Sequence, residues 1–152
     1  MDGFVAAMDD MLASFYRNML RLEKQEIMKS RQPSLTISEV HLILCIGDSR
    51  GEGRTVTALA RLLNITVSSA TIAVNKLGQK GYVKKVKGSA DGRIVRVYLT
   101  EQGKSVDTYH RICRRDMIKE ISRGFTPEER KIAVKVINRL NEYFVKNVDD
   151  TF

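Results

Sequence analysis

Residues 55–103 read TVTALARLLNITVSSATIAVNKLGQKGYVKKVKGSADGRIVRVYLTEQG, and this stretch decides the fold. Thr55 and Thr66 are good helix N-caps, and each precedes apolar residues at helical spacing. The pattern predicts helices over 56–63 and 67–79, joined by a turn at Asn64-Ile65 and ended by Gly81. Two short helices joined by so few residues have the layout of a helix-turn-helix.

The same patterns assign the inner and outer faces of these two helices. In the first we expect the leucines to point inward: Leu59, Leu62 and Leu63. In the second, Ala70, Val74 and Leu77 should face the core, which leaves its polar residues partly outward.

The apolar period then changes from helical spacing to alternation. Residues 82–87 and 94–99 alternate apolar and polar side chains, and the turn residues of 88–92 lie between them. This pattern predicts a β-hairpin. A hairpin that follows a helix-turn-helix is the wing of a winged helix.

Longer helical patterns flank the central stretch on both sides. Apolar residues recur at steps of three and four within residues 4–28. Thr36-Ile37-Ser38-Glu39 is a capping box that opens a helix over 37–46, and 48–54 has the composition of a loop. Helices are predicted over 101–123 and, after a second capping box at 126–129, up to residue 147.

We therefore expect a mainly α fold with a small β-hairpin wing, built as one unit over residues 1–152. Residues 36–100 form the winged-helix DNA-binding region, and residues 1–33 and 101–152 form dimerisation helices. The terminal helices carry apolar stripes with little core left to cover, so a symmetric homodimer is expected. A monomeric bundle of helices is the alternative, which the hairpin and the short central helices make less favourable.

Composition excludes several other classes of protein. The chain has 152 residues and 43% hydrophobic residues, which suits a packed core. It has no run of 18 apolar residues, and its first 16 residues carry acids but no basic residue, so we expect neither a membrane span nor a signal peptide. A cytoplasmic protein is expected. No catalytic motif is recognised, so we expect no enzyme activity and no cofactor.

Positive charge is concentrated in one segment. The formal net charge is +8, and residues 76–96 contain seven basic residues against one acid, Asp91. Clustered positive charge is typical of a surface that binds the phosphates of double-stranded DNA. A solvated basic face is the alternative interpretation.

The second helix of a helix-turn-helix presents its N-terminal residues to base edges in the major groove. Small hydroxyl side chains suit this task, because they allow close approach and hydrogen-bond to bases or phosphates. Arg93 at the hairpin tip is expected to enter the minor groove, with Asp91 holding it extended; an ordinary Asp-Gly turn is the alternative. The candidate DNA-binding residues are Thr66, Ser68, Ser69, Thr71, Asn75, Lys76, Lys87 and Arg93.

Taken together, these motifs resemble the multiple-antibiotic-resistance regulator (MarR) family. The family pattern LA-x-x-L-x-V-(S/T)-x-x-(S/T) is followed by KG(Y/L)V, a D-x-R wing and LT-x-x-G, and residues 55–103 match it closely. The resemblance implies a dimer, a palindromic operator and an effector pocket between the dimerisation and winged regions. The family wing often reads Asp-Arg-Arg, whereas this chain has Asp91-Gly92-Arg93 and so lacks one phosphate-binding charge.

Within that family, the segment ISEVHLILCIG is most similar to the fatty-acid biosynthesis repressor branch. That resemblance implies long-chain acyl groups on acyl carrier protein as the effector. A deformable apolar wall suits flexible chains of varied length. We expect the pocket between the N-terminal stripe and the 37–46 helix, lined by Met11, Phe15, Met19, His41, Leu44 and Cys45.

Two other functions remain open at this point. His41 and Cys45 lie four residues apart, and His110 and Cys113 lie three apart, so a metal- or thiol-responsive sensor is one alternative. With no further ligand evident, no metal site is assigned. The other alternative is a non-regulatory basic module, either an architectural or an RNA-binding protein. The leading hypothesis is a ligand-responsive transcriptional repressor.

Overall fold

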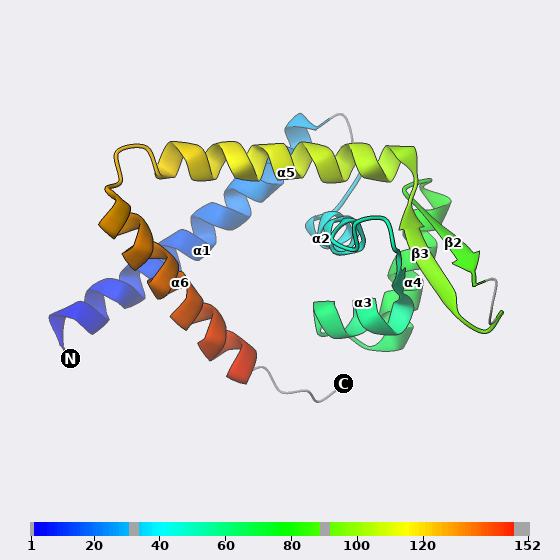
Figure 1. The fold of residues 1–152 in the computed structure, drawn as a ribbon, viewed down its shortest axis with the longest axis horizontal. Helices are drawn as coiled ribbons and strands as arrows, with labels where there is room; N and C mark the ends of the chain where they lie inside the picture. The colour runs from blue at the N-terminus through cyan, green and yellow to red at the C-terminus, as the bar shows by residue number, and fades with distance from the viewer. Residues whose placement is uncertain (1, 31–33, 89–91, 148–152) are drawn as a thin grey trace.

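The computed structural model describes residues 2–30, 34–88 and 92–147. Figure 1 shows a winged unit on one side, from which long helices extend to the other side. The elements in chain order are α1 (Gly3–Lys29), α2 (Ile37–Gly47), β1 (Arg54–Thr55), α3 (Val56–Leu63), α4 (Val67–Gln79), β2 (Val83–Lys87), β3 (Val95–Leu99), α5 (Glu101–Ile121) and α6 (Pro127–Asn147). The predicted fold class, mainly α with a small wing, is confirmed.

Side-chain caps fix where the helices begin. In each case a threonine oxygen accepts a hydrogen bond from the backbone N–H three residues later, which satisfies one of the free donors of the first turn. Both predicted capping boxes form, at Thr36 with Glu39 and at Thr126 with Glu129. The threonines that open α2, α3, α4 and α5 are Thr36, Thr55, Thr66 and Thr100.

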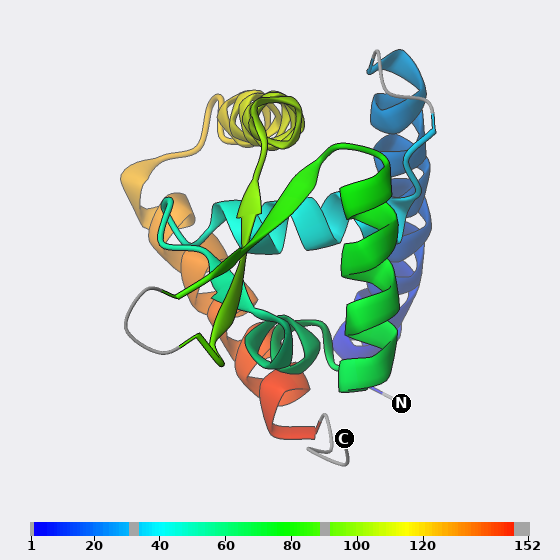
Figure 2. The same ribbon diagram turned by 90° about the vertical axis from the view of Figure 1, so that its right-hand side faces the viewer.

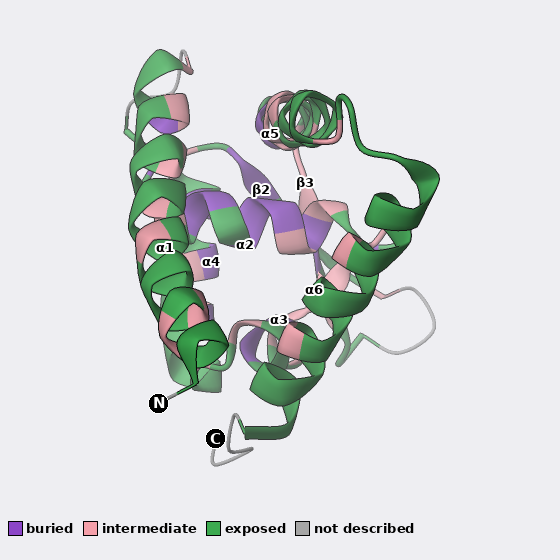
Figure 3. Ribbon diagram, turned by 90° about the vertical axis from the view of Figure 1, so that its left-hand side faces the viewer, coloured by how far each residue is buried: buried purple, intermediate pink, exposed green. Residues whose placement is uncertain are grey.

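Helix α2 lies at the centre of the winged unit, where most of its length is buried (Figure 3). The first helix of the helix-turn-helix, the second helix and the sheet all contribute fully buried side chains to the same core. The largest fully buried side chains, those of α2 included, are Leu42, Ile43, Ile46, Leu59, Val74, Leu77 and Val97.

The sheet has three antiparallel strands in the order β1-β3-β2, which is one strand more than predicted. Arg54 and Thr55 pair with Val97 and Arg96, whereas the sequence indicated a loop that continues through Arg54. The prediction was wrong because a two-residue strand has no alternation to detect. Its pairing partners lie more than 40 residues further along the chain.

Leu62 is a second correction. Its side chain is 55% exposed, although the leucine pattern of α3 predicted that it faces inward. Leu59 and Ala60 are buried and Leu63 packs on the core, and at 100° per residue Leu62 falls outside the arc that these three define.

The long helices contribute little to this core. Helix α1 has one buried residue, Ile27, and none of the described residues of α6 is buried. In the part of the chain that the structure describes, no single helix is both long enough and apolar enough to cross a membrane. Helices α3 and α4 together reach the length and composition of a span, but they are bent by 109° relative to each other.

Gly103 permits the close approach of α5 to the wing, and its replacement should be costly. A Cβ atom at this position would lie 2.1 Å from the backbone oxygen of Tyr82, which already accepts a hydrogen bond from the Thr100 amide. Gly103→Ala should therefore lower the free energy of unfolding by about 1–3 kcal/mol, as expected for overpacking against backbone. Denaturant unfolding measures this change.

Gly78→Ala is the matched control, because Gly78 also lies within a helix. Among the described residues, a Cβ atom at this position would meet only the backbone oxygen of Val83, at 3.8 Å. It should be neutral or stabilising by up to about 1 kcal/mol, since alanine favours helix. Equal stability of the two variants would contradict the packing of α5 on the wing described here.

Candidate nucleic-acid interface

The angle between α3 and α4 is set by a short left-handed turn. The two helices meet at 109°, within the range of helix-turn-helix motifs. Asn64 has a φ of 52°, a conformation that asparagine tolerates better than most residues, and the Ile65 amide donates to the Ala60 oxygen. Ala60 and Ala70 are both buried, and their small side chains allow the two helices to pack closely.

Helix α4 separates an apolar inner face from a polar outer face. Ala70, Val74 and Leu77 are fully buried. Thr71 is half-buried at the edge of the helix, and the remaining predicted DNA-binding positions on α4 and its cap are exposed: Thr66, Ser68, Ser69, Asn75 and Lys76. The structure therefore brings these six predicted residues to one surface.

The hydroxyl groups on this surface differ in how many hydrogen bonds they already make within the chain. The Thr66 hydroxyl donates to Ser69 Oγ at 2.9 Å and the Thr71 hydroxyl donates to the Val67 oxygen at 2.8 Å. Ser68 has no hydrogen-bond partner among the described residues. Its hydroxyl is thus the one of these four that keeps both its donor and its acceptor capacity for a base or phosphate.

The wing adds positive charge beside α4. Lys85 Nζ donates to Asn75 Oδ1 at 2.5 Å and so links the wing strand β2 to the helix. The Asn75 amide nitrogen keeps its two donors for base acceptors. Lys87 is exposed on the same face of β2 as Lys85, so this surface is positive next to hydrogen-bonding groups.

Arg93 lies in the turn that leads into β3, and its side chain is exposed. Figure 2 shows the backbone of the two wing strands, β2 and β3. The predicted contact from Asp91 to Arg93 falls outside the described residues. Entry of Arg93 into the minor groove stays a prediction.

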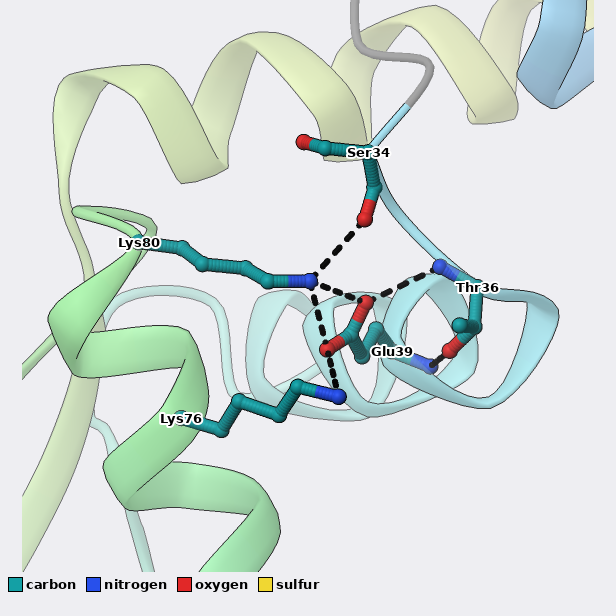
Figure 4. Close-up of polar contacts among 5 residues, drawn as sticks. All are labelled: Ser34, Thr36, Glu39, Lys76 and Lys80. Atoms are coloured by element: carbon teal, nitrogen blue, oxygen red, sulfur yellow. Dashed lines mark hydrogen bonds and ion pairs between the residues drawn. The ribbon is translucent and has the colours of Figure 1, made fainter.

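Glu39 anchors α4 to α2 (Figure 4). It is only 6% exposed, and its carboxylate accepts from Lys80 Nζ with both oxygens at 2.8 Å. Lys76 Nζ lies 3.5 Å from the same carboxylate, and the Thr36 amide donates to it at 2.9 Å. Lys80 Nζ also donates to the Ser34 oxygen. A buried acid with these donors ties the C-terminal end of α4 to the start of α2.

This anchor changes the interpretation of the basic segment. Lys80 belongs to the positive cluster of residues 76–96, but its charge is directed inward to Glu39 rather than toward a ligand. The charge available to phosphates is therefore smaller than the composition indicates. From the sequence alone, a lysine at this position is predicted to be surface charge, because its buried acidic partner lies 41 residues away in the chain.

Burial raises the pKa of Glu39, but the hydrogen bonds from Lys80 and the Thr36 amide and the charges of Lys80 and Lys76 outweigh that effect. The pKa of Glu39 is therefore below its ordinary value. The carboxylate is charged in the folded state at neutral pH, as the anchor requires.

The residues of the predicted effector pocket are only partly brought together. Leu44 is buried and Cys45 is half-buried in α2, whereas Met11 and Phe15 in α1 are 67% and 61% exposed. Met19 is also exposed. The stripe on α1 is therefore open to a partner surface in the single chain, and the pocket stays a prediction.

Two acids of α1, Glu23 and Glu26, make polar contacts from this helix to α2 and α5. His41 Nε2 lies 3.1 Å from Glu23 Oε1, and Glu26 Oε2 accepts from the Tyr109 hydroxyl and from Cys113 Sγ. Among residues 2–30, 34–88 and 92–147, no three His, Cys, Asp or Glu side chains are grouped so that they could hold a metal ion. The metal-sensor alternative gains no support from this arrangement.

The thiol-sensor alternative is also disfavoured by the surroundings of the two cysteines. Burial, together with the Asp48 charge, raises the pKa of the Cys45 thiol, although Arg54 opposes the shift. Burial and the hydrogen bond to Glu26 raise the pKa of the Cys113 thiol. Raised pKa values keep thiols protonated, and the protonated form is the less reactive one.

A cavity of about 490 Å³ lies beside the base of the wing. Polar and charged side chains line most of it, and no residue of the predicted effector pocket is among its described lining. The lining comprises residues 48–50, 52–55, Ala58 and Arg96.

Comparison with known proteins agrees with this geometry. The family model described as MarR family matches residues 34–94. The transcriptional regulator AdcR of Streptococcus pneumoniae serotype 2 (strain D39 / NCTC 7466) is 24% identical over 110 residues, which cover 70% of this chain and 73% of AdcR.

Among solved structures, Streptococcus pneumoniae FabT in complex with DNA is similar to nearly the whole chain. The TM-score is 0.87 at 26% identity, and the match covers 93% of this chain and 98% of FabT. The transcriptional regulator SlyA has a TM-score of 0.71 at 18% identity, covering 91% of this chain and 96% of SlyA, which shows the shared fold alone.

Removal of the Glu39 charge should weaken the hold of α2 on α4. Glu39→Gln should lower the free energy of unfolding by about 1–3 kcal/mol at neutral pH, the range for buried hydrogen bonds to charged groups. Because the pKa of Glu39 is lowered by folding, its contribution is complete above its ordinary pKa and is lost as pH falls through the lowered value. Denaturant unfolding from neutral to acidic pH should show the two proteins converging.

Glu101→Gln provides a matched control. Glu101 also pairs with a lysine, Lys104, but its side chain is 90% exposed, so this substitution should leave stability nearly unchanged. If Glu39→Gln were as mild as Glu101→Gln at neutral pH, the anchor would not stabilise the fold.

Proposed function

We propose that this chain, which matches the MarR family model over residues 34–94, is a dimeric winged helix-turn-helix repressor whose operator affinity is set by a small ligand. In this proposal residues 36–100 bind DNA, residues 1–33 and 101–152 form the dimer, and the operator is palindromic. No step of the proposed function requires catalysis or a cofactor.

One observation carries the DNA-binding part of this proposal. The exposed face of α4 presents hydroxyl and amide groups beside the lysines of β2, on a helix whose opposite face is locked into the core. Hydrogen-bonding groups held in place next to positive charge are what reading of a major groove needs. The likeness to FabT, solved in complex with DNA, supports the same assignment.

The dimer is proposed from the apolar surface of the long helices α1, α5 and α6, which we call the arms. Large hydrophobic side chains of α1 and α6 are exposed in the single chain, and apolar surface on this scale is normally covered in solution. A second copy of the chain supplies matching faces around a two-fold axis, which a palindromic operator mirrors. The exposed residues are Phe4, Met11, Phe15, Met19 and Leu22 in α1, and Ile132, Val136, Ile137 and Phe144 in α6.

The ligand is proposed to be a long-chain acyl group on acyl carrier protein, and the targets to be fatty-acid synthesis genes. The similarity to FabT supports this branch over others in the family. The methionine and phenylalanine stripe of α1 offers a deformable apolar wall, and α2 offers Leu44 and the polar side chain of His41. A ligand here changes DNA affinity only if it binds the two conformations of the dimer unequally.

Arg93→Ala should weaken operator binding. It removes a cation from a groove where negative potential is concentrated, so we expect a loss of about 1–3 kcal/mol per half-site and a shallower dependence of affinity on salt. Fluorescence anisotropy with an operator duplex over a salt series measures both quantities.

Arg123→Ala is the control for Arg93→Ala, because it removes the same charge from the turn after α5, where Arg123 pairs with Glu120. It should leave affinity and salt dependence unchanged. Sedimentation should show dimers for the wild type and both variants. A fully active monomer would contradict the dimer, and an unaltered Arg93→Ala variant would show that the wing does not touch DNA.

Met19→Trp should abolish the ligand response while operator binding survives. The larger ring narrows the space between α1 and α2, so operator affinity should be the same with and without acyl-carrier-protein thioesters of long acyl chains. Met28→Trp is the control, since Met28 is exposed on the same helix beyond the proposed wall and should respond like the wild type. A wild-type protein indifferent to thioesters of every chain length would refute the acyl effector.

A further inference from the structure

Ile72 occupies the middle of the outer face of α4. The buried residues Ala70, Val74 and Leu77 define the inner face, and at 100° per residue Ile72 lies almost directly opposite them. Its side chain is 69% exposed. A wholly aliphatic side chain therefore lies at the position of α4 that is furthest from the core.

The surroundings of Ile72 do not explain it as part of an apolar patch. Its neighbours on this face, Ser68, Asn75 and Lys76, are polar and exposed. The exposed apolar side chains of the arms lie on α1, α5 and α6, which are separate elements (Figure 1). Ile72 thus lies among hydrogen-bonding groups and positive charge on this face of α4. The other exposed apolar residue of the helix, Val67, is about 140° away around the helix axis.

We propose that Ile72 is a specificity-determining residue that packs against the 5-methyl group of a thymine in the major groove. This inference rests on the proposed DNA-binding function. Thymine is the base whose major-groove edge carries a methyl group, and apolar side chains recognise it there. Ile72 is β-branched, so its side chain holds essentially one rotamer in a helix and presents its methyl groups at a fixed place.

The charge of the surface selects DNA as the occupant. Lys76 is exposed on α4, and Lys85 and Lys87 are exposed on one face of β2, which packs beside α4. A protein partner would bind through a larger apolar surface, whereas Ile72 is surrounded by cations and hydroxyl groups. A thymine methyl offers a small apolar contact within a strongly anionic groove, which matches that mixture.

The test begins with an operator selected from a pool of random duplexes by the full-length wild-type protein. Each thymine is then replaced by deoxyuridine, which pairs in the same way but lacks the methyl group. At one position in each half-site the wild type should lose affinity by about 4-fold, the factor that corresponds to burial of one methyl group. Anisotropy titrations at constant salt measure the loss.

The Ile72→Ala variant should bind the unmodified operator more weakly and lose no further affinity at the deoxyuridine position. Ile72→Val keeps a branched apolar group and should retain most of the methyl effect. Leu62→Ala removes another exposed apolar side chain, from α3, and should behave as the wild type at the deoxyuridine position. Thermal unfolding confirms that each variant is folded.

Three results would overturn the inference: a wild type that binds every deoxyuridine operator equally, an Ile72→Ala variant as sensitive to deoxyuridine as the wild type, or a selected operator without thymine in its half-sites. Each of these leaves a sequence-specific DNA-binding protein. Failure to select any operator would instead refute the proposed function itself.

Discussion

The winged unit depends on burial of the short helix α2. Its apolar side chains form the centre against which α3, α4, α5 and the sheet pack, so loss of this helix would leave each of them without a core. Burial of α2 also takes one acid, Glu39, out of water, and a buried carboxylate is tolerated only with partners. Lys80 and Lys76 supply them from α4. The need to neutralise one charge thus ties the C-terminal end of α4 to the start of α2.

The winged unit and the arms differ in how far their apolar side chains are buried within the single chain. In the winged unit, apolar side chains are buried in one core and the free backbone donors of the helix starts are capped, all within one chain. The arms bury far less of their apolar surface, because α1 has a single buried residue and α6 has none among its described residues. The winged unit buries its apolar side chains within one chain, whereas those of the arms would be covered in the proposed dimer.

This division explains what the sequence predicts well and what it does not. The helix starts at Thr36, Thr55 and Thr66 were predictable because a cap involves residues three apart in the chain. Strand β1 and the partner of Lys80 were not, because each depends on residues some 40 positions away. The outward position of the polar candidates on α4 follows from helical periodicity, and their choice as DNA-binding residues follows from the helix-turn-helix layout. The effector pocket cannot follow from any single-chain pattern if one of its walls needs a second copy.

The direct connection between the wing and α5 has a mechanical consequence. Strand β3 ends at Leu99 and α5 begins at Glu101, so one residue separates them, and the Thr100 amide is bonded back to Tyr82. With 21 residues at 1.5 Å each, α5 is a rigid rod of about 32 Å. A tilt of about 5° at its far end moves the wing by about 3 Å, nearly the rise of one base pair. The rod acts as a lever, so in the proposed dimer a small change among the long helices would bring the two winged units out of step with the helical repeat of DNA.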